Sequence, residues 1–112
     1  MIGIDIVKID RIKNITHKDA FVSRVLHEAE IAIYHDFNES WRQDQWLAGR
    51  FAAKEAIIKA LPFENVFMKD VWIQNEDHKL FCEYQGIKLV VSISHETEMA
   101  VAIAMILASD PT

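Results

Sequence analysis

A single carboxylate interrupts the apolar segment near the start of the sequence. Asp5 lies inside Ile2-Gly3-Ile4-Asp5-Ile6-Val7, which has the composition of a β-strand. A carboxylate in such a segment is tolerated where it reaches the surface, caps a neighbouring element or binds a cation. For one aspartate alone, exposure or capping is the commoner role, and cation binding stays open as the functional alternative.

A glutamate and a lysine four residues apart form the second candidate. Glu55 and Lys59 share one face of a predicted helix. As an isolated pair they predict only a weak helix-stabilising contact of about 0.2–0.5 kcal/mol. In the functional alternative, Glu55 provides a hard oxygen ligand for Mg²⁺ and Lys59 places a charge near a phosphate.

The third candidate is Ser92-Ile93-Ser94-His95, at the end of a predicted strand. An imidazole with neighbouring hydroxyls suits phosphate binding or proton relay, and a turn histidine bonded to the backbone is the structural alternative. A serine nucleophile has little support because the sequence has no Gly-x-Ser-x-Gly motif. Its three glycines are also too scattered for a phosphate-binding or dinucleotide-binding loop.

Composition limits the class of protein to which these candidates belong. The 112 residues are 51% hydrophobic, which predicts one domain over residues 1–112 with a hydrophobic core. The net charge of −5 argues against general nucleic-acid binding. No apolar run approaches the ~20 residues that cross a bilayer, and no secretory leader is evident. Because Cys82 is the one cysteine, we expect no internal disulfide, no zinc cage and a cytoplasmic location.

Hydrophobic periodicity predicts the elements that must position the candidates. A capping-box pattern at Ser40 and Gln43 and a stop at Pro62 bound the longest predicted helix. The predicted helical segments are residues 9–15, about Phe21–Tyr34 and about Trp41–Leu61. The predicted strands are Met1–Val7, Val71–Gln74, Leu80–Tyr84, Leu89–Ser94 and Met99–Leu107, with Asn75–His78 as a hairpin turn.

The last predicted strand alternates large apolar residues with alanines. Ala100, Ala102 and Ala104 would lie against the alanine-rich long helix, which includes Ala52 and Ala56. This arrangement gives an α+β fold, in which a mostly antiparallel sheet packs against a long central helix.

Three segments together resemble one family. Gly3–Arg11, Gly49–Ala56 and Ser92–His95 have the order and spacing of the holo-[acyl-carrier-protein] synthases, the short bacterial 4′-phosphopantetheinyl transferases. The resemblance covers nearly the full length, and its second segment is highly specific. It implies transfer of 4′-phosphopantetheine from coenzyme A to a serine of apo acyl carrier protein, for fatty acid and lipid biosynthesis. Adenosine 3′,5′-bisphosphate would be released.

The resemblance also implies roles for individual residues. Asp5 and Glu55 would hold Mg²⁺, and Lys59 would either stabilise the transferred phosphoryl group or assist deprotonation of the carrier serine. The residues implied to contact coenzyme A phosphates are Arg42, Arg50 and His95. Residues 1–24 carry a net charge of +2, and the residues implied to dock the acidic carrier protein are Arg11, Lys13, Lys18 and Arg24.

A homotrimer with active sites between subunits is a further implication. Asp5 and Glu55 would then lie opposite Arg50 and His95 of the adjacent subunit. The bulky side of the last strand also needs a covering partner.

Three segments depart from the usual family pattern. Leu61–Glu64 replaces a Gly-Thr-Gly-like loop, Leu26–Glu30 replaces Leu-Thr-x-x-Glu, and Asp77-His78-Lys79 replaces a Gly-Lys-Pro turn. The path of the loop at 61–64 near the pantetheine arm therefore stays open. A non-catalytic carrier-binding module and a Mg²⁺-dependent phosphohydrolase are the competing functions. The identity of the carrier and the choice between Mg²⁺ and Mn²⁺ are open as well.

Overall fold

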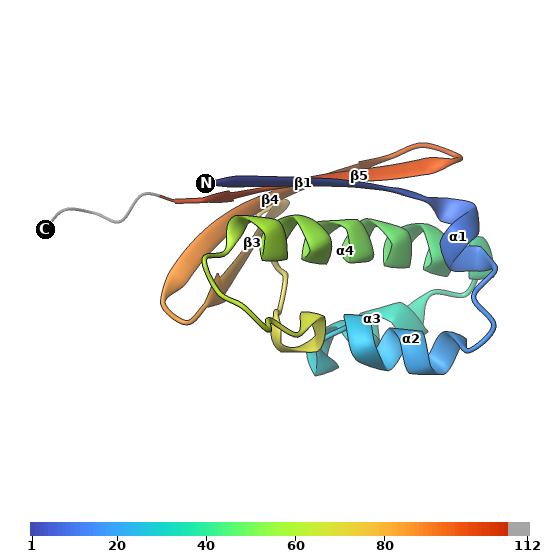
Figure 1. The fold of residues 1–112 in the computed structure, drawn as a ribbon. Coiled ribbons are helices and arrows are strands. Elements are labelled where there is room, and N and C mark those ends of the chain that lie inside the picture. The colour runs from blue at the N-terminus through green and yellow to red at the C-terminus, as the bar shows by residue number, and fades with distance from the viewer. Residues whose placement is uncertain (108–112) are drawn as a thin grey trace, which may run out of the picture.

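The computed structural model describes residues 1–107, in which five antiparallel strands form one sheet (Figure 1). The strands lie in the order β1-β5-β4-β3-β2. Their bounds are β1 (Ile2–Lys8), β2 (Gln74–Glu76), β3 (Lys79–Tyr84), β4 (Ile87–His95) and β5 (Met99–Ile106). This sheet and the helices beside it confirm the predicted α+β class.

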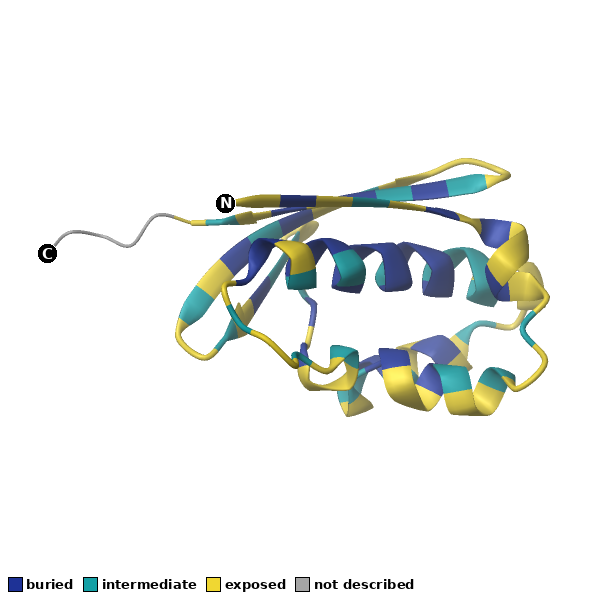
Figure 2. Cartoon of the chain, in the orientation of Figure 1, coloured by how far each residue is buried: buried dark blue, intermediate teal, exposed yellow. Residues whose placement is uncertain are grey.

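The helices lie on one side of the sheet, with the longest of them directly against it (Figure 1). Their bounds are α1 (Ile9–Lys13), α2 (Lys18–Val25), α3 (Glu28–Asp36), α4 (Ser40–Ala60) and the 3₁₀ helix η1 (Met68–Asp70). Helix α4 separates α2 and α3 from the strands, and its buried side chains form a large part of the core (Figure 2). Among the described residues, no helix is both long and apolar enough to span a membrane.

Small side chains let α4 approach the sheet closely. A Cβ atom added to Gly3 would lie 1.9 Å from the carbonyl oxygen of Ala56, so β1 tolerates no side chain there. The alanines of β5 that face α4 are fully or almost fully buried, as are those of the helix. The predicted packing of alanines against alanines is therefore confirmed.

Two helix boundaries differ from the prediction. The predicted helix over Phe21–Tyr34 is two helices, because the backbone is extended at Leu26 and His27. The predicted capping box at Ser40 is wrong, since α4 starts there with Glu39 as an N-cap that makes no side-chain bond. Gln43 instead donates to the carbonyl oxygen of Tyr34 at 3.0 Å, which ties α4 to α3.

The capping box of this chain lies at the start of α3. The Nδ1 atom of His27 accepts a hydrogen bond from the backbone of Ala29 at 3.0 Å, and Glu30 Oε1 accepts one from the backbone of His27 at 2.7 Å. Histidine is not among the usual N-cap residues, so the sequence pattern did not reveal it.

The outward face of the sheet is apolar and exposed near β1 and β5. The side chains that point away from α4 on β1 are Ile2, Ile4 and Ile6, each more than half exposed. Ile103 and Met105 of β5 pair with Ile4 and Ile2 and are also exposed. We call these five residues the outer sheet face. A contiguous apolar surface of this kind is typical of an interaction site.

Candidate active site

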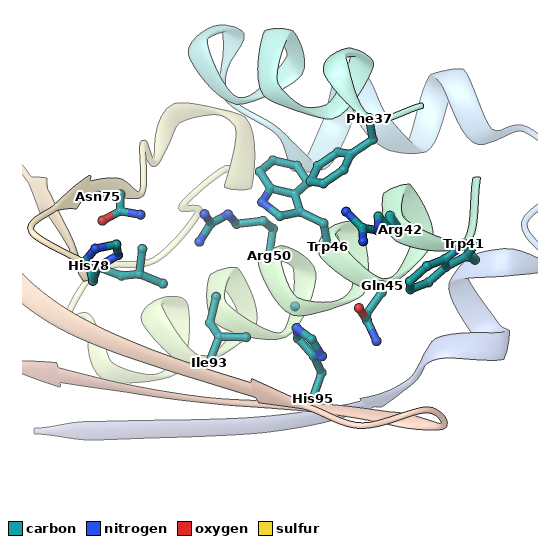
Figure 3. Close-up of a pocket in the computed structure, with 12 residues that line it drawn as sticks. Phe37, Trp41, Arg42, Gln45, Trp46, Arg50, Asn75, His78, Ile93 and His95 are labelled. Atoms are coloured by element: carbon teal, nitrogen blue, oxygen red, sulfur yellow. The ribbon is translucent and has the colours of Figure 1, made fainter. Parts of the chain in front are cut away.

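A cavity of about 520 Å³ opens between the first half of α4, strand β4 and the β2–β3 hairpin (Figure 3). Helix α4 places one row of side chains along the cavity. Strand β4 adds Ile93 and His95, which lie on the face of the strand that is turned toward α4. The polar and charged residues that line it are Arg42, Gln45, Arg50, Asn75, His78 and His95.

The lining of this cavity is cationic although the chain as a whole is acidic. None of the described residues that line it is an aspartate or a glutamate, whereas the net charge of the chain is −5. The cavity brings together Arg42, Arg50 and His95, the three residues predicted to contact coenzyme A phosphates. Such a lining suits a ligand with several negative charges.

Arg50 has unused capacity for an anion. Its guanidinium lies over the ring of Trp46, with Cζ 4.9 Å from the ring centroid, and its Nε is buried without a hydrogen-bond partner. Burial lowers the pKa of Arg50, and the nearby Glu30 carboxylate opposes that shift. Because arginine stays protonated in proteins, the buried N–H is a donor that an anionic ligand can satisfy.

The predicted catalytic residues form a separate group beside β1. Alternation along the strand turns Asp5 toward α4, where Lys59 Nζ donates to Asp5 Oδ1 and to the carbonyl oxygen of Ile4, each at 3.0 Å. Glu55 lies one helical turn before Lys59 and is half-buried. None of these three residues lines the cationic cavity. Within one chain, the predicted site residues therefore fall into two groups.

The donor set of the β1 group suits a hard cation. Asp5 and Glu55 offer carboxylate oxygens, and no cluster of three or more metal-ligating side chains occurs within residues 1–107. Two carboxylates fit Mg²⁺, which usually keeps several waters and takes further ligands from a substrate phosphate. They do not by themselves make a complete coordination shell.

A family model described as the 4′-phosphopantetheinyl transferase superfamily matches residues 1–104. The chain belongs to this superfamily. The predicted resemblance is therefore confirmed.

Two relatives of this transferase carry the same name. The holo-[acyl-carrier-protein] synthase of Staphylococcus saprophyticus is 39% identical over 106 residues, covering 90% of this chain and 91% of the relative. That of Caldicellulosiruptor saccharolyticus is 39% identical over 117 residues, covering 93% of each chain.

Solved structures of synthases share the fold of this transferase. The Bacillus anthracis synthase, solved in complex with CoA (3′,5′-ADP), has a TM-score of 0.83 and 35% identity and covers 96% of both chains. The Helicobacter pylori synthase, solved with coenzyme A, has a TM-score of 0.80 and 30% identity, over 96% of this chain and 100% of that one.

Two of the predicted docking residues of this transferase lie over aromatic rings that are tilted against each other. Arg11 lies 5.6 Å from the ring centroid of Phe51, and Arg24 lies 6.0 Å from that of Phe21. The two rings are 5.4 Å apart, so α1, α2 and α4 meet there. Cation–π contacts leave the guanidinium N–H groups free for carboxylates.

The other two predicted docking residues, Lys18 and Lys13, differ in whether their charge is paired within the protein. Lys18 Nζ lies 2.8 Å from Asp44 Oδ1, and both side chains are mostly buried. Its charge is therefore used within the protein, because an ion pair with an interior partner leaves little for an external one. Lys13 is exposed at the end of α1.

A buried ion pair between α3 and α4 was not predicted from the sequence. Lys54 Nζ donates to Glu30 Oε1 at 2.6 Å, to the carbonyl oxygen of Met68 at 2.9 Å and to that of Val71. Glu30 Oε2 accepts from the backbone of Ile73 at 3.0 Å. Burial lowers the pKa of Lys54, and the Glu30 carboxylate opposes that shift. The pair joins α3 and α4 to the segment that leads into β2.

This pair also explains why the predicted strand over Val71–Gln74 is wrong in its first part. The backbone groups of Val71 and Ile73 bond to Lys54 and Glu30 rather than to a neighbouring strand. Pairing with β3 begins only at Gln74. The position of Lys54 within the Gly49–Ala56 segment was a signal of its importance, but its burial was not evident from the sequence.

Proposed function

We propose that this protein transfers 4′-phosphopantetheine from coenzyme A to a serine of apo acyl carrier protein and releases adenosine 3′,5′-bisphosphate. One observation carries the proposal: the cavity has a cationic lining without carboxylates and a buried, unpartnered N–H of Arg50. Coenzyme A is a polyanion of the kind that such a lining attracts. Relatives solved with coenzyme A share this fold and support the assignment. We place the reaction in cytoplasmic fatty acid synthesis.

The β1 group supplies the chemistry in this proposal. Asp5 and Glu55 would hold Mg²⁺, which would supply positive charge that stabilises the negative charge developing on the leaving bisphosphate. Lys59 lies beside Asp5, with its ammonium 3.0 Å from Oδ1. From there it either stabilises the transferred phosphoryl oxygens or assists removal of the proton from the attacking serine hydroxyl.

Mass spectrometry of the carrier tests this function. The protein is incubated with coenzyme A, Mg²⁺ and an apo carrier protein, and we expect the carrier to gain the mass of phosphopantetheine. Carrier binding without a gain in mass would identify a non-catalytic binding module. Breakdown of coenzyme A without carrier modification would identify a phosphohydrolase.

We further propose that the two groups of site residues meet between subunits of a homotrimer. Asp5, Glu55 and Lys59 of one chain would face Arg50 and His95 of the next. Two observations support this: the groups are separate within one chain, and the outer sheet face offers an exposed apolar surface for a partner. Burial of such a surface favours association.

Mixing two inactive variants tests the shared site. Asp5→Ala and His95→Ala proteins are unfolded and refolded together at equal concentration. In randomly mixed trimers about one interface in four carries neither substitution, so activity returns to about a quarter of the wild-type value. If native mass spectrometry finds mixed trimers but activity stays absent, each site is built within one chain.

Charge reversal tests the docking surface. We expect Arg11→Glu to raise the KM for the carrier about tenfold and to leave the KM for coenzyme A unchanged, because like charges then face each other at the interface. The carrier KM of the wild type should also rise with salt, since exposed charges are screened over about 8 Å at physiological ionic strength. Steady-state kinetics at two salt concentrations measure both effects.

Lys18→Gln is a matched control for the docking test. It removes a cation that is already paired with Asp44, so the carrier KM should change less than twofold. A carrier KM that is unchanged in Arg11→Glu and insensitive to salt would contradict docking through the basic segment.

A further inference from the structure

A histidine in the turn between β2 and β3 belongs to the cationic cavity. His78 and Asn75 line the cavity from the hairpin, whereas Arg42 and Arg50 line it from α4. Figure 3 shows the Arg50 side chain extending from α4 toward the turn that carries His78. The sequence places His78 in a turn that departs from the Gly-Lys-Pro turn of the family. Neither the fold nor the proposed roles of the other residues require an imidazole there.

The backbone of this turn favours glycine at the position of His78. Glu76 and Lys79 pair across the hairpin, which leaves Asp77 and His78 as a two-residue turn. Their φ angles are 52° and 64°, in the left-handed region. Turns of this type favour Asn-Gly or Asp-Gly, because a Cβ atom is disfavoured in that conformation. The chain therefore keeps an imidazole at the cavity where glycine is the more stable turn residue.

We propose that His78 is a further ligand-binding residue, whose imidazole donates a hydrogen bond to a phosphate oxygen of coenzyme A bound in the cavity. The inference rests on the proposed function, since that function places coenzyme A there. The charged and titratable groups that face the same space are Arg42 and Arg50 from α4 and His95 from β4. With His78, donors from three elements would surround the phosphate. A protonated imidazole carries a charge and donates from both ring nitrogens, so it binds a phosphate more strongly than a neutral imidazole does.

His78→Gly separates a binding role from a structural one. We expect this variant to unfold at a temperature about 2–4 °C higher than the wild type, because glycine relieves the left-handed conformation. We also expect it to bind coenzyme A about tenfold more weakly at pH 6.0, with a smaller loss of about threefold at pH 8.5. Isothermal titration calorimetry with coenzyme A measures the affinity, and differential scanning calorimetry measures the stability.

Two further variants make the result specific. His78→Asn tolerates the same backbone and keeps an uncharged donor, so its affinity should match that of the wild type at pH 8.5 and fall below it at pH 6.0. Lys79→Ala removes a cation from the same hairpin that does not line the cavity, and its affinity should stay within twofold of the wild type. Equal losses in His78→Gly and Lys79→Ala would overturn the inference, because the effect would then be one of net charge.

The test distinguishes this inference from the function on which it rests. A wild-type protein that does not bind coenzyme A would overturn the proposed function. Binding by the wild type with the same affinity in His78→Gly at both pH values would overturn the role of His78 alone.

Discussion

Glu55→Gln and Asp5→Asn are each expected to reduce phosphopantetheine transfer by about 10²–10³-fold while the protein stays folded. Both substitutions keep the size of the side chain and remove a charged oxygen ligand, so the charge that develops on the leaving bisphosphate loses its stabilisation. Raising the Mg²⁺ concentration should not restore the rate. Turnover is measured by the mass of the carrier, and folding by circular dichroism.

The fold should tolerate these changes because Asp5 and Glu55 are only partly buried and each keeps its size. The ion pair between Asp5 and Lys59 is partly exposed, with the lysine side chain 52% accessible, so its loss costs about 0–1 kcal/mol of unfolding free energy. Glu28→Gln, on the exposed side of α3, is the matched control and should keep wild-type turnover. Near-native turnover of Asp5→Asn or Glu55→Gln at ordinary Mg²⁺ would show that the metal assignment is wrong.

Lys54→Met is expected to have the largest effect on stability, about 3–5 kcal/mol of unfolding free energy. The substitution leaves the Glu30 carboxylate buried without its cation and removes the donor to the carbonyl oxygens of Met68 and Val71. Small domains unfold with a total of about 5–15 kcal/mol, so much of the stability would be lost. Urea denaturation followed by tryptophan fluorescence measures the change.

The thiol of Cys82 provides a second readout of this variant. Burial raises the pKa of Cys82 to about 11, so the folded protein holds very little thiolate at pH 8 and should react slowly with thiol reagents. Unfolding of Lys54→Met exposes the thiol, and labelling should become faster than in the wild type.

Two comparisons isolate the buried pair. The double variant Lys54→Met with Glu30→Gln should be less destabilised than the sum of the single variants, because no uncompensated charge remains. Lys69→Met removes an exposed lysine from η1, and its unfolding free energy should stay within about 0.5 kcal/mol of the wild type. If Lys54→Met unfolds at the wild-type urea concentration, the ion pair does not support the fold.

Local sequence patterns predicted the packing and the direction of side chains correctly where side-chain size or alternation along a strand determines them. The alanines of the last strand and of α4 are small at matching intervals, and they pack together as predicted. Asp5 also faces the helix because residues alternate along a strand. The spacing of four residues, about one turn, keeps Glu55 and Lys59 on one side of α4.

Contacts between distant segments were not predictable from such patterns. Lys18 is predicted to dock the carrier, and its ion-pair partner Asp44, 26 residues further along the chain, is not evident from the sequence. Val71 and Ile73 look like strand residues, yet their backbone groups bond to buried side chains of α4 and α3. His78 looks like an ordinary turn residue, because nothing near it in the sequence indicates the cavity. In each case the role of the residue depends on side chains from another helix or strand.

The strand order also has a consequence for how the chain acquires its structure. Strand β5 is the last element, yet it lies between β1 and β4 and pairs with both along their length. During synthesis, β1 therefore has no sheet partner until β5 has left the ribosome, although α4 can already pack against it. Pairings that join distant parts of a chain are slow to form and leave apolar edges open in the meantime. Loss of β5 would split the sheet into two parts, so nascent chains that stop before Met99 should be targets for chaperones and proteases.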